Sequence, residues 1–289
     1  MRSQLVLAIV LATMGASRTA AAFCRSTACR GSACTTDERG CPSTGKPLYW
    51  STGCIGYSLQ KNLSQNLPQD EARLAIQRAF QAWAEVDCGG GKFSSLTFSP
   101  LADVSCNRAE HNENGTNVNV ITFKDDDWTY KGVDNNVAKT TVTFDGDTGE
   151  IFDADIEVNS ATNQISVSDK SAQYDLQSIL THEVGHLIGL AHSEDPSATM
   201  FASYETGSTA LRSLSDDDIA AVCAAYPPGR AATCSSTPRG GLGDACNVEE
   251  SSSGCGYATG GAVTPLSLCL LLSTLLSRTL RARRRRCDR

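Results

Sequence analysis

Histidine is scarce in this chain: only four occur in 289 residues. A basic excess is also absent, with 25 Lys and Arg against 32 Asp and Glu, so the basic stripe typical of nucleic-acid binders is not expected. Wholesale disorder is excluded, because 40% of the residues are hydrophobic and can form a core. The 13 cysteines, by contrast, are too many for an ordinary cytosolic enzyme and indicate an oxidising compartment.

The first 22 residues have the features of a secretory signal peptide. Arg2 precedes an apolar stretch, Leu5–Ala16, and the small residues Ala20–Ala22 suit a signal peptidase. We expect cleavage after Ala22, which would leave Phe23 as the N-terminus. The alternative is an uncleaved membrane anchor, which is less favoured because the apolar run is too short to span a bilayer.

Residues 255–289 form a second terminal segment of distinct composition. A Gly-Cys pair that ends at Cys255 leads into the mostly apolar stretch Tyr257–Leu276, and an arginine cluster that includes Arg283–Arg286 follows. This order resembles the sorting tails of myxobacterial surface proteins, which implies processing near Cys255. The alternative is a plain C-terminal membrane anchor. In either case we expect contact with a membrane only through this tail, with the body outside the cell.

Without the two ends, the body is strongly acidic and has an even number of cysteines. Nine of the 25 basic residues and one of the 32 acidic residues lie outside residues 23–254, which leaves a net charge of −15. Ten of the 13 cysteines remain, so complete disulfide pairing is permitted. We divide the body into a Cys-rich extension (23–46), a folded domain (47–228) and a Gly/Ser/Cys linker (229–254).

Hydrophobic periodicity predicts helices and strands in mixed order within the domain. Apolar residues at helical spacing predict three main helices, and Ser215 with Asp218 resembles a capping box at the start of the third. Alternating patterns predict strands. The mixed order favours the α+β class. The predicted helices cover residues 68–86, 172–188 and 216–226, and the predicted β segments cover 47–50, 55–59, 96–98, 118–123, 140–144 and 151–158.

Three of the four histidines lie close together, in and just after the second predicted helix. His182 and His186 are four residues apart, so both imidazoles project from one helical face and can bind a single zinc ion. Glu183 can reach a water bound to that metal. Gly189 can adopt a backbone conformation closed to other residues, which would end the helix and bring back His192 as the third ligand. Three protein ligands leave one zinc position open, which is typical of a catalytic site.

This run resembles the metzincin signature, in particular that of the matrixins, the branch that includes the matrix metalloproteinases. Met200 matches the methionine whose turn underlies the zinc site in that superfamily, and Tyr204 matches a tyrosine that helps to wall the primed-side specificity pocket. The resemblance spans about residues 48–227. It implies a twisted mixed sheet, an active-site helix that carries the zinc motif, and a zinc metalloendopeptidase activity on protein or peptide substrates.

Three departures from the matrixin pattern modify these expectations. Phe201 and Ala202 stand where a Tyr-Pro pair is usual, so the shape of the pocket should differ. Only His111 remains to match the three histidines of a second, structural zinc, so we expect one zinc ion. We do not expect a long propeptide, because only about 25 residues separate Phe23 from the domain. Cys41 could act as a thiolate zinc ligand that keeps the enzyme latent, but that would leave an unpaired cysteine, so a disulfide is favoured.

The resemblance and the motif together predict a mechanism. Zinc would activate a water, Glu183 would accept its proton, and the substrate would lie extended along an edge strand near Thr140–Phe144. Calcium is a further possible ligand, because carboxylates of a suitable kind occur in two groups. These groups are Asp125, Asp126 and Asp127, and Asp145, Asp147, Asp153 and Asp155.

The leading interpretation is therefore a secreted or cell-surface zinc endopeptidase, expected to be a monomer. The alternative from another class is a non-catalytic surface adhesion module on a metzincin scaffold. Such degeneration typically removes the base or a ligand, and here Glu183 and the three histidines are all present.

Overall fold

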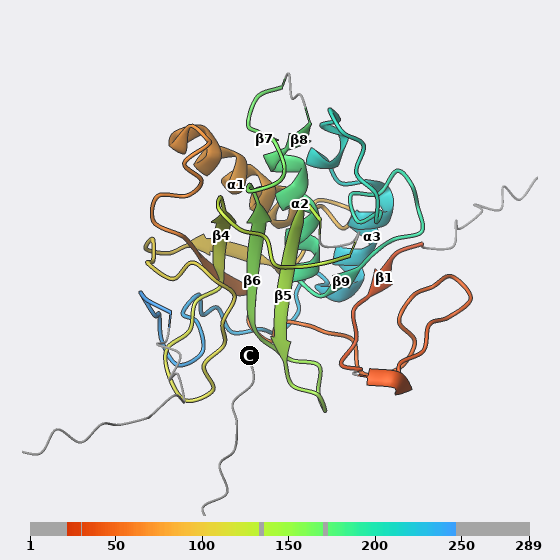
Figure 1. The fold of residues 1–289 in the computed structure, drawn as a ribbon. Coiled ribbons are helices and arrows are strands. Elements are labelled where there is room, and N and C mark those ends of the chain that lie inside the picture. Colours follow the sequence, from red (N-terminus) through yellow and green to blue (C-terminus); the bar gives the residue numbers. More distant parts are fainter. Residues whose placement is uncertain (1–21, 30, 133–135, 170–172, 247–289) are drawn as a thin grey trace, which may run out of the picture. The chain divides into compact units, whose positions relative to one another are not determined.

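A five-stranded mixed sheet forms the centre of the protein, in a computed structural model that describes residues 22–29, 31–132, 136–169 and 173–246 (Figure 1). The strand order is β3-β2-β4-β6-β5. The first four of these strands are parallel to one another, while β5 runs antiparallel to β6 and forms an edge of the sheet. The strands are β2 (Cys54–Leu59), β3 (Thr97–Pro100), β4 (Val120–Lys124), β5 (Ala138–Phe144) and β6 (Ile151–Asn159).

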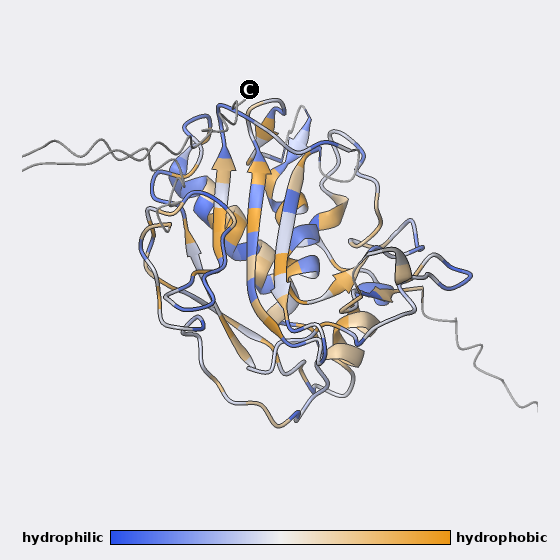
Figure 2. Cartoon of the chain, turned by 60° about the horizontal axis from the view of Figure 1, so that its bottom comes forward, coloured by the Kyte–Doolittle hydropathy of each residue, from blue (hydrophilic) through white to orange (hydrophobic). Residues whose placement is uncertain are grey.

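Two of the three main helices pack on one face of this sheet and form the core with it (Figure 1). Helix α1 (Gln69–Ala84) follows β2 and connects it to the parallel strand β3. Helix α2 (Leu176–Leu187) packs against α1, and the Trp83 indole N–H donates to the Thr181 carbonyl at 2.8 Å. Orange apolar positions interrupted by blue polar ones run along the central strands in Figure 2, as expected for a sheet with one face in the core.

The third helix and several short elements complete the fold. Helix α3 (Asp216–Ala225) begins with the predicted capping box, in which the Ser215 and Asp218 side chains bond reciprocally to the backbone. The fold confirms the predicted α+β class with three main helices. The short elements are β1 (Cys24–Arg25), η1 (Gly31–Ala33), β7 (Ile165–Ser166), β8 (Tyr174–Asp175), β9 (Leu190–Ala191) and η3 (Ala210–Arg212).

Two predicted elements differ from the observed ones. Residues 47–50 form only isolated bridges, Thr27 with Pro47 and Tyr49 with Glu150, instead of a strand. Helix α2 begins at Leu176, not near 172, because Asp175 caps it by accepting the Ser178 backbone N–H at 2.8 Å. Both differences follow from contacts that lie outside the local hydrophobic pattern.

All ten cysteines of the body are paired, in five disulfides. Two of the five disulfides, Cys24–Cys41 and Cys29–Cys34, lie within the extension. Cys41 is therefore not a free thiol, and the alternative in which it binds zinc is wrong. The other three disulfides join distant parts of the chain: Cys54–Cys234, Cys88–Cys223 and Cys106–Cys246.

The segment expected to be a linker, 229–254, is in large part packed on the domain. Besides two disulfides, the Gly53 N–H donates to the Thr233 carbonyl at 2.8 Å, and the Arg230 guanidinium donates to the Trp50 carbonyl at 2.9 Å. Its Gly- and Ser-rich composition is typical of a linker, but the cross-links hold residues 229–246 in place. The predicted signal peptide up to residue 21 and the tail over 255–289 lie outside the described residues. Among those described, no helix is both long and apolar enough to span a bilayer.

Candidate metal centre and active site

The three histidines of the motif meet at one point beside helix α2. The helix ends as predicted, because Gly189 adopts a φ of +88°, and a Cβ there would lie 2.7 Å from the Leu48 carbonyl oxygen. Strand β9 follows and brings His192 back to the helix. The His186 Nε2 atom lies 3.1 Å from that of His182 and 3.2 Å from that of His192. In the described part of the chain, no other group of His, Cys, Asp or Glu side chains brings three ligand atoms together in this way.

The hydrogen bonds of the imidazoles fit a metal ion. His182 Nδ1 lies 2.7 Å from the Thr199 carbonyl and His186 Nδ1 lies 3.0 Å from the Leu190 carbonyl. A carbonyl only accepts, so each Nδ1 carries the proton and each Nε2 presents a lone pair. Two lone pairs 3.1 Å apart repel unless a cation lies between them. The separation is close to the about 3.3 Å expected between two nitrogen ligands of tetrahedral zinc.

Burial keeps these imidazoles in the form that binds metal. It lowers the pKa of His182 to about 4, and it also lowers the pKa of His186. Both rings are therefore neutral near pH 7. The triad residues could hold one zinc ion with an open fourth position.

Glu183 is buried next to the first of these histidines, with a side chain 7% exposed. Burial raises the pKa of this carboxyl group, and a hydrogen bond from Thr140 partly opposes the rise. The Thr140 hydroxyl, on the edge strand β5, donates to Glu183 Oε2 at 2.6 Å. The sequence places Thr140 in an edge strand near the substrate but carries no signal for this contact with Glu183.

Met200 packs against the motif helix at Gly185. Its side chain is 2% exposed, and a Cβ on Gly185 of α2 would lie 2.1 Å from its sulfur atom. The buried Asp218 carboxylate of α3 accepts the backbone N–H groups of Thr199 at 2.7 Å and Met200 at 3.0 Å. Since the Thr199 carbonyl orients His182, Asp218 holds the turn that positions a candidate zinc ligand. The capping pattern marked Asp218 in the sequence, but nothing there indicated this second role.

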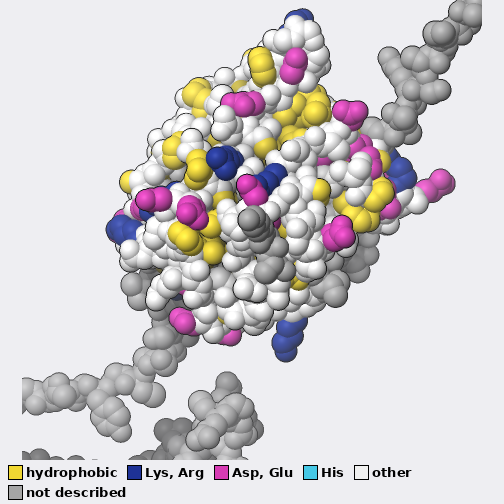
Figure 3. All heavy atoms as spheres, turned by 90° about the horizontal axis from the view of Figure 1, so that it is seen from above, with side chains coloured by type: hydrophobic (Ala, Val, Ile, Leu, Met, Phe, Trp, Pro, Cys, Tyr) yellow, Lys and Arg dark blue, Asp and Glu magenta, His cyan; other side chains and the backbone are white. Residues whose placement is uncertain are grey.

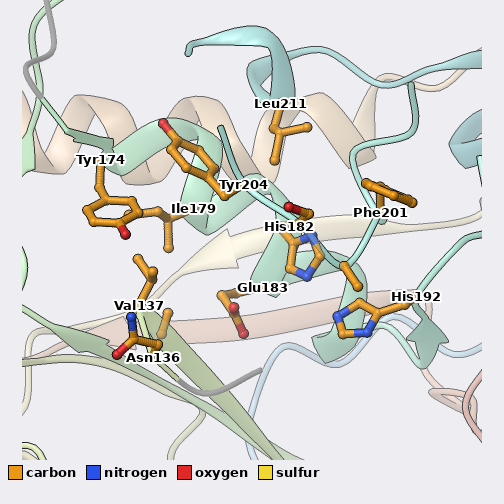
Figure 4. Close-up of a pocket in the computed structure, with 13 residues that line it drawn as sticks. Asn136, Val137, Tyr174, Ile179, His182, Glu183, His192, Phe201, Tyr204 and Leu211 are labelled. Carbon is orange, nitrogen blue, oxygen red and sulfur yellow. The ribbon is translucent and has the colours of Figure 1, made fainter. Parts of the chain in front are cut away.

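A hollow of about 380 Å³ opens beside the triad and contains the predicted pocket residue Tyr204 (Figure 4). Tyr204 accepts the Asp175 backbone N–H at 2.8 Å and donates to the Ser208 carbonyl at 2.6 Å. Arg212 forms two hydrogen bonds to the fully buried Asp175 carboxylate, at 2.6 and 2.8 Å. The loop that walls the hollow is thus fixed to the start of α2. Phe201 and Leu211 also line the hollow, and Figure 4 shows Glu183 close to the imidazoles.

The two groups of carboxylates considered for calcium do not form a common cluster. Asp125 is occupied as an acceptor for Ser64, Gln65 and Ser160. Asp145 accepts the backbone N–H groups of its own turn, at residues 147 and 148. The remaining carboxylates of the two groups are either exposed or, as for Asp153 and Asp155, buried on the sheet face away from the helices. Calcium therefore stays a prediction.

Charged side chains are scattered over the described surface. On the face in Figure 3, Asp and Glu side chains are spread among uncharged atoms, with fewer Lys and Arg between them. No continuous basic stripe is present on the described part of that face, which agrees with the acidic composition of the body.

The fold and the histidine motif together define an α+β metalloprotease of the metzincin class. Comparison with known families shows to which family within this class the chain belongs. The Matrixin family model matches residues 49–227, which include the sheet, the three main helices and the triad. The chain belongs to the matrixin family.

Relatives of known name are similar over the same region. Matrix metalloproteinase-C of Caenorhabditis elegans is 27% identical over 192 residues, which are 65% of this chain and 30% of the relative. Human neutrophil collagenase is 27% identical over 177 residues (61% and 33%), and human matrix metalloproteinase-16 is 29% identical over 183 residues (62% and 27%). The chain thus spans about a third of the length of these relatives. Membership in this family supports a zinc-dependent metalloendopeptidase at the level of the family.

Proposed function

We propose that this protein cleaves peptide bonds within extended substrates, with His182, His186 and His192 holding one catalytic zinc ion and Glu183 acting as the general base. The observation that carries the proposal is the convergence of three Nε2 atoms next to a buried carboxylate at the edge of a sheet. The zinc ion, when bound, would lower the pKa of a bound water and polarise the scissile carbonyl.

The hydrogen bonds of Glu183 support its proposed role. Thr140 engages Oε2, which leaves Oε1 to accept the proton of the attacking water. Glu183 then donates this proton to the nitrogen of the leaving amine. The raised pKa of a buried carboxyl favours such transfers near neutral pH, since it brings the acid closer to the working pH.

The substrate would bind along β5 by backbone pairing. As an edge strand, β5 has one side that is not paired within the sheet, and a peptide can add to it as a further strand. Ala138, the first residue of β5, and Val137 just before it line the hollow next to Glu183. Pairing would therefore bring a backbone carbonyl of the peptide to the triad, while the side chain that follows enters the hollow walled by Tyr204.

Export to the cell exterior is part of this proposal. Five disulfides are consistent with an oxidising compartment. The Phe23 backbone nitrogen donates to Asp217 Oδ1 at 3.0 Å, and Ser193, which follows His192, donates to Oδ2 at 2.7 Å. Signal-peptide cleavage after Ala22 would convert that nitrogen to an ammonium group paired with Asp217. Mass spectrometry of the exported protein should find Phe23 at its N-terminus, and another N-terminal residue would contradict this step. Retention of the body at the cell surface through the 255–289 tail remains a proposal from the sequence.

A peptide-library digest tests the proposed activity. The protein exported from the full chain should cleave internal bonds, lose the activity after treatment with a zinc chelator, and regain it when zinc is added back. Cleavage that is insensitive to the chelator would contradict zinc catalysis. Zinc-loaded protein that binds peptides without cleaving them would instead support the non-catalytic adhesion module.

A further inference from the structure

A second hollow, of about 350 Å³, continues the first one along the edge strand. The two hollows share Ala138, Glu183 and His192 among their lining residues. Residues 136–138 line the first hollow, and residues of β5 between Ala138 and Phe144 line the second. A peptide that paired with β5 would therefore pass through both, with the triad at their junction.

The outer wall of the second hollow comes from the N-terminal extension. Thr27 and Cys29 of the extension line the hollow together with Val142 and Phe144 of β5, and Leu48 contributes a further apolar surface. Apolar side chains thus come from two sides of the hollow. The wall is not part of the region that matches the Matrixin family model, which begins at residue 49.

The extension is held firmly against the zinc site. Strand β1 pairs with β9 in antiparallel register, and the Ser26 N–H donates to the Gly189 carbonyl at 3.0 Å (Figure 1). The Ser26 hydroxyl donates to the Leu190 carbonyl at 3.0 Å, the same carbonyl that orients His186. Two disulfides close the extension on itself. The wall is therefore prearranged, so little ordering would oppose binding there.

We propose that this second hollow is a substrate-binding subsite, built by the extension, which takes a large apolar side chain of the peptide on the N-terminal side of the scissile bond. The proposal rests on the proposed endopeptidase function. Antiparallel pairing, the stronger mode, would run the peptide from Phe144 towards Ala138. Peptide residues in the second hollow would then precede the scissile bond at the triad, and peptide residues in the first hollow would follow it.

Two variants of opposite effect test the subsite in zinc-loaded protein expressed from the full chain. Thr27→Trp should fill the hollow, and Val142→Ala should enlarge it. Thr36→Trp is the matched control, because Thr36 is an exposed residue of the same extension and does not line the hollow. Each protein is used to digest one peptide library, and the preferences are read separately on the two sides of the cleaved bonds.

Thr27→Trp should lower kcat/KM by about tenfold or more for peptides with a large apolar residue at one upstream position, because a pocket rejects a side chain that no longer fits. Peptides with Gly or Ala there should be affected less, so the preference of Thr27→Trp for the large side chain over Gly or Ala should fall. Val142→Ala should shift the preference at that position towards larger side chains, and the control should match the wild type. Preferences for residues downstream of the cleaved bond should stay unchanged in all three variants.

Unchanged upstream preferences in both variants, with activity retained, would overturn the subsite, as would a change confined to the downstream side. If Thr27→Trp does not fold, the Val142→Ala profile decides alone. A wild-type protein that cleaves no peptide would count against the proposed function, which is a different outcome from loss of the subsite.

Discussion

The Thr140 hydroxyl is predicted to hold the general base in its productive position. It donates to Glu183 Oε2 at 2.6 Å and lies 3.2 Å from the Glu183 carbonyl oxygen. A hydrogen bond to a charged group contributes about 1.5–3 kcal/mol. If this is lost from the transition state, Thr140→Val should lower kcat by about 10- to 100-fold, since 1.36 kcal/mol corresponds to a factor of ten. Because the change preserves side-chain shape, KM should stay within about twofold.

Steady-state cleavage of a single peptide by the zinc-loaded protein measures this effect. Thr140→Ser keeps a hydroxyl at the same position and should restore most of kcat. Thr141→Val is the matched control, because it makes the same chemical change one residue along β5, where the hydroxyl is buried and has no hydrogen-bond partner among the described residues. Wild-type kcat in Thr140→Val would refute the reasoning. An equal loss in both valine variants would also refute it, since it would show a general effect on the strand.

Three further predictions concern the support of the site, the buried carboxylates and calcium. Gly185→Ala should destabilise the protein by about 1–3 kcal/mol in thermal unfolding, because the new Cβ would lie 2.1 Å from the Met200 sulfur. Adding Met200→Ala to the same chain should recover part of this loss. If the effects of the two substitutions on stability simply add, the contact is contradicted. Burial raises the pKa of Asp153 to about 7, so the folded state holds a proton that the unfolded state releases above about pH 4. Burial also raises the pKa of the neighbouring Asp155, so the two carboxyl groups share this effect. The free energy of unfolding should therefore fall as the pH rises above about 4, and Asp153→Asn should make this slope smaller in urea titrations while the exposed control Asp126→Asn should keep it. Calcium, added with zinc held constant, should raise the melting temperature if the carboxylate groups bind it, and an unchanged temperature would exclude a stabilising calcium site.

The zinc motif could be predicted from the sequence because its geometry is local. His182 and His186 are placed on one face by helical periodicity alone, and Gly189 indicates where the helix must end. The helices and most strands were predicted within a few residues for the same reason. The place of β5 at an edge of the sheet is expected only from the resemblance to a known family, and the order of the other strands has no signal in the sequence.

Contacts between distant segments could not be predicted, because they depend on how those segments pack. Thr140 reaches Glu183 across 43 residues of sequence, and Asp218 reaches Met200 across 18. The pairing of Cys234 with Cys54 likewise has no local signal, and it converts a segment with the composition of a linker into part of the domain. The extension offered cysteine spacing but no sign that Thr27 would line a hollow next to the triad.

The most direct test of the central claim compares zinc content and peptide cleavage in Glu183→Ala and in the wild type. Both proteins should bind about one zinc ion per chain, because the three histidines are unchanged. Cleavage by the variant should fall by at least about 10²-fold, the effect typical of a lost general base. Undiminished cleavage by Glu183→Ala with zinc bound would contradict the proposed mechanism, as would a wild-type protein that cleaves peptides without zinc.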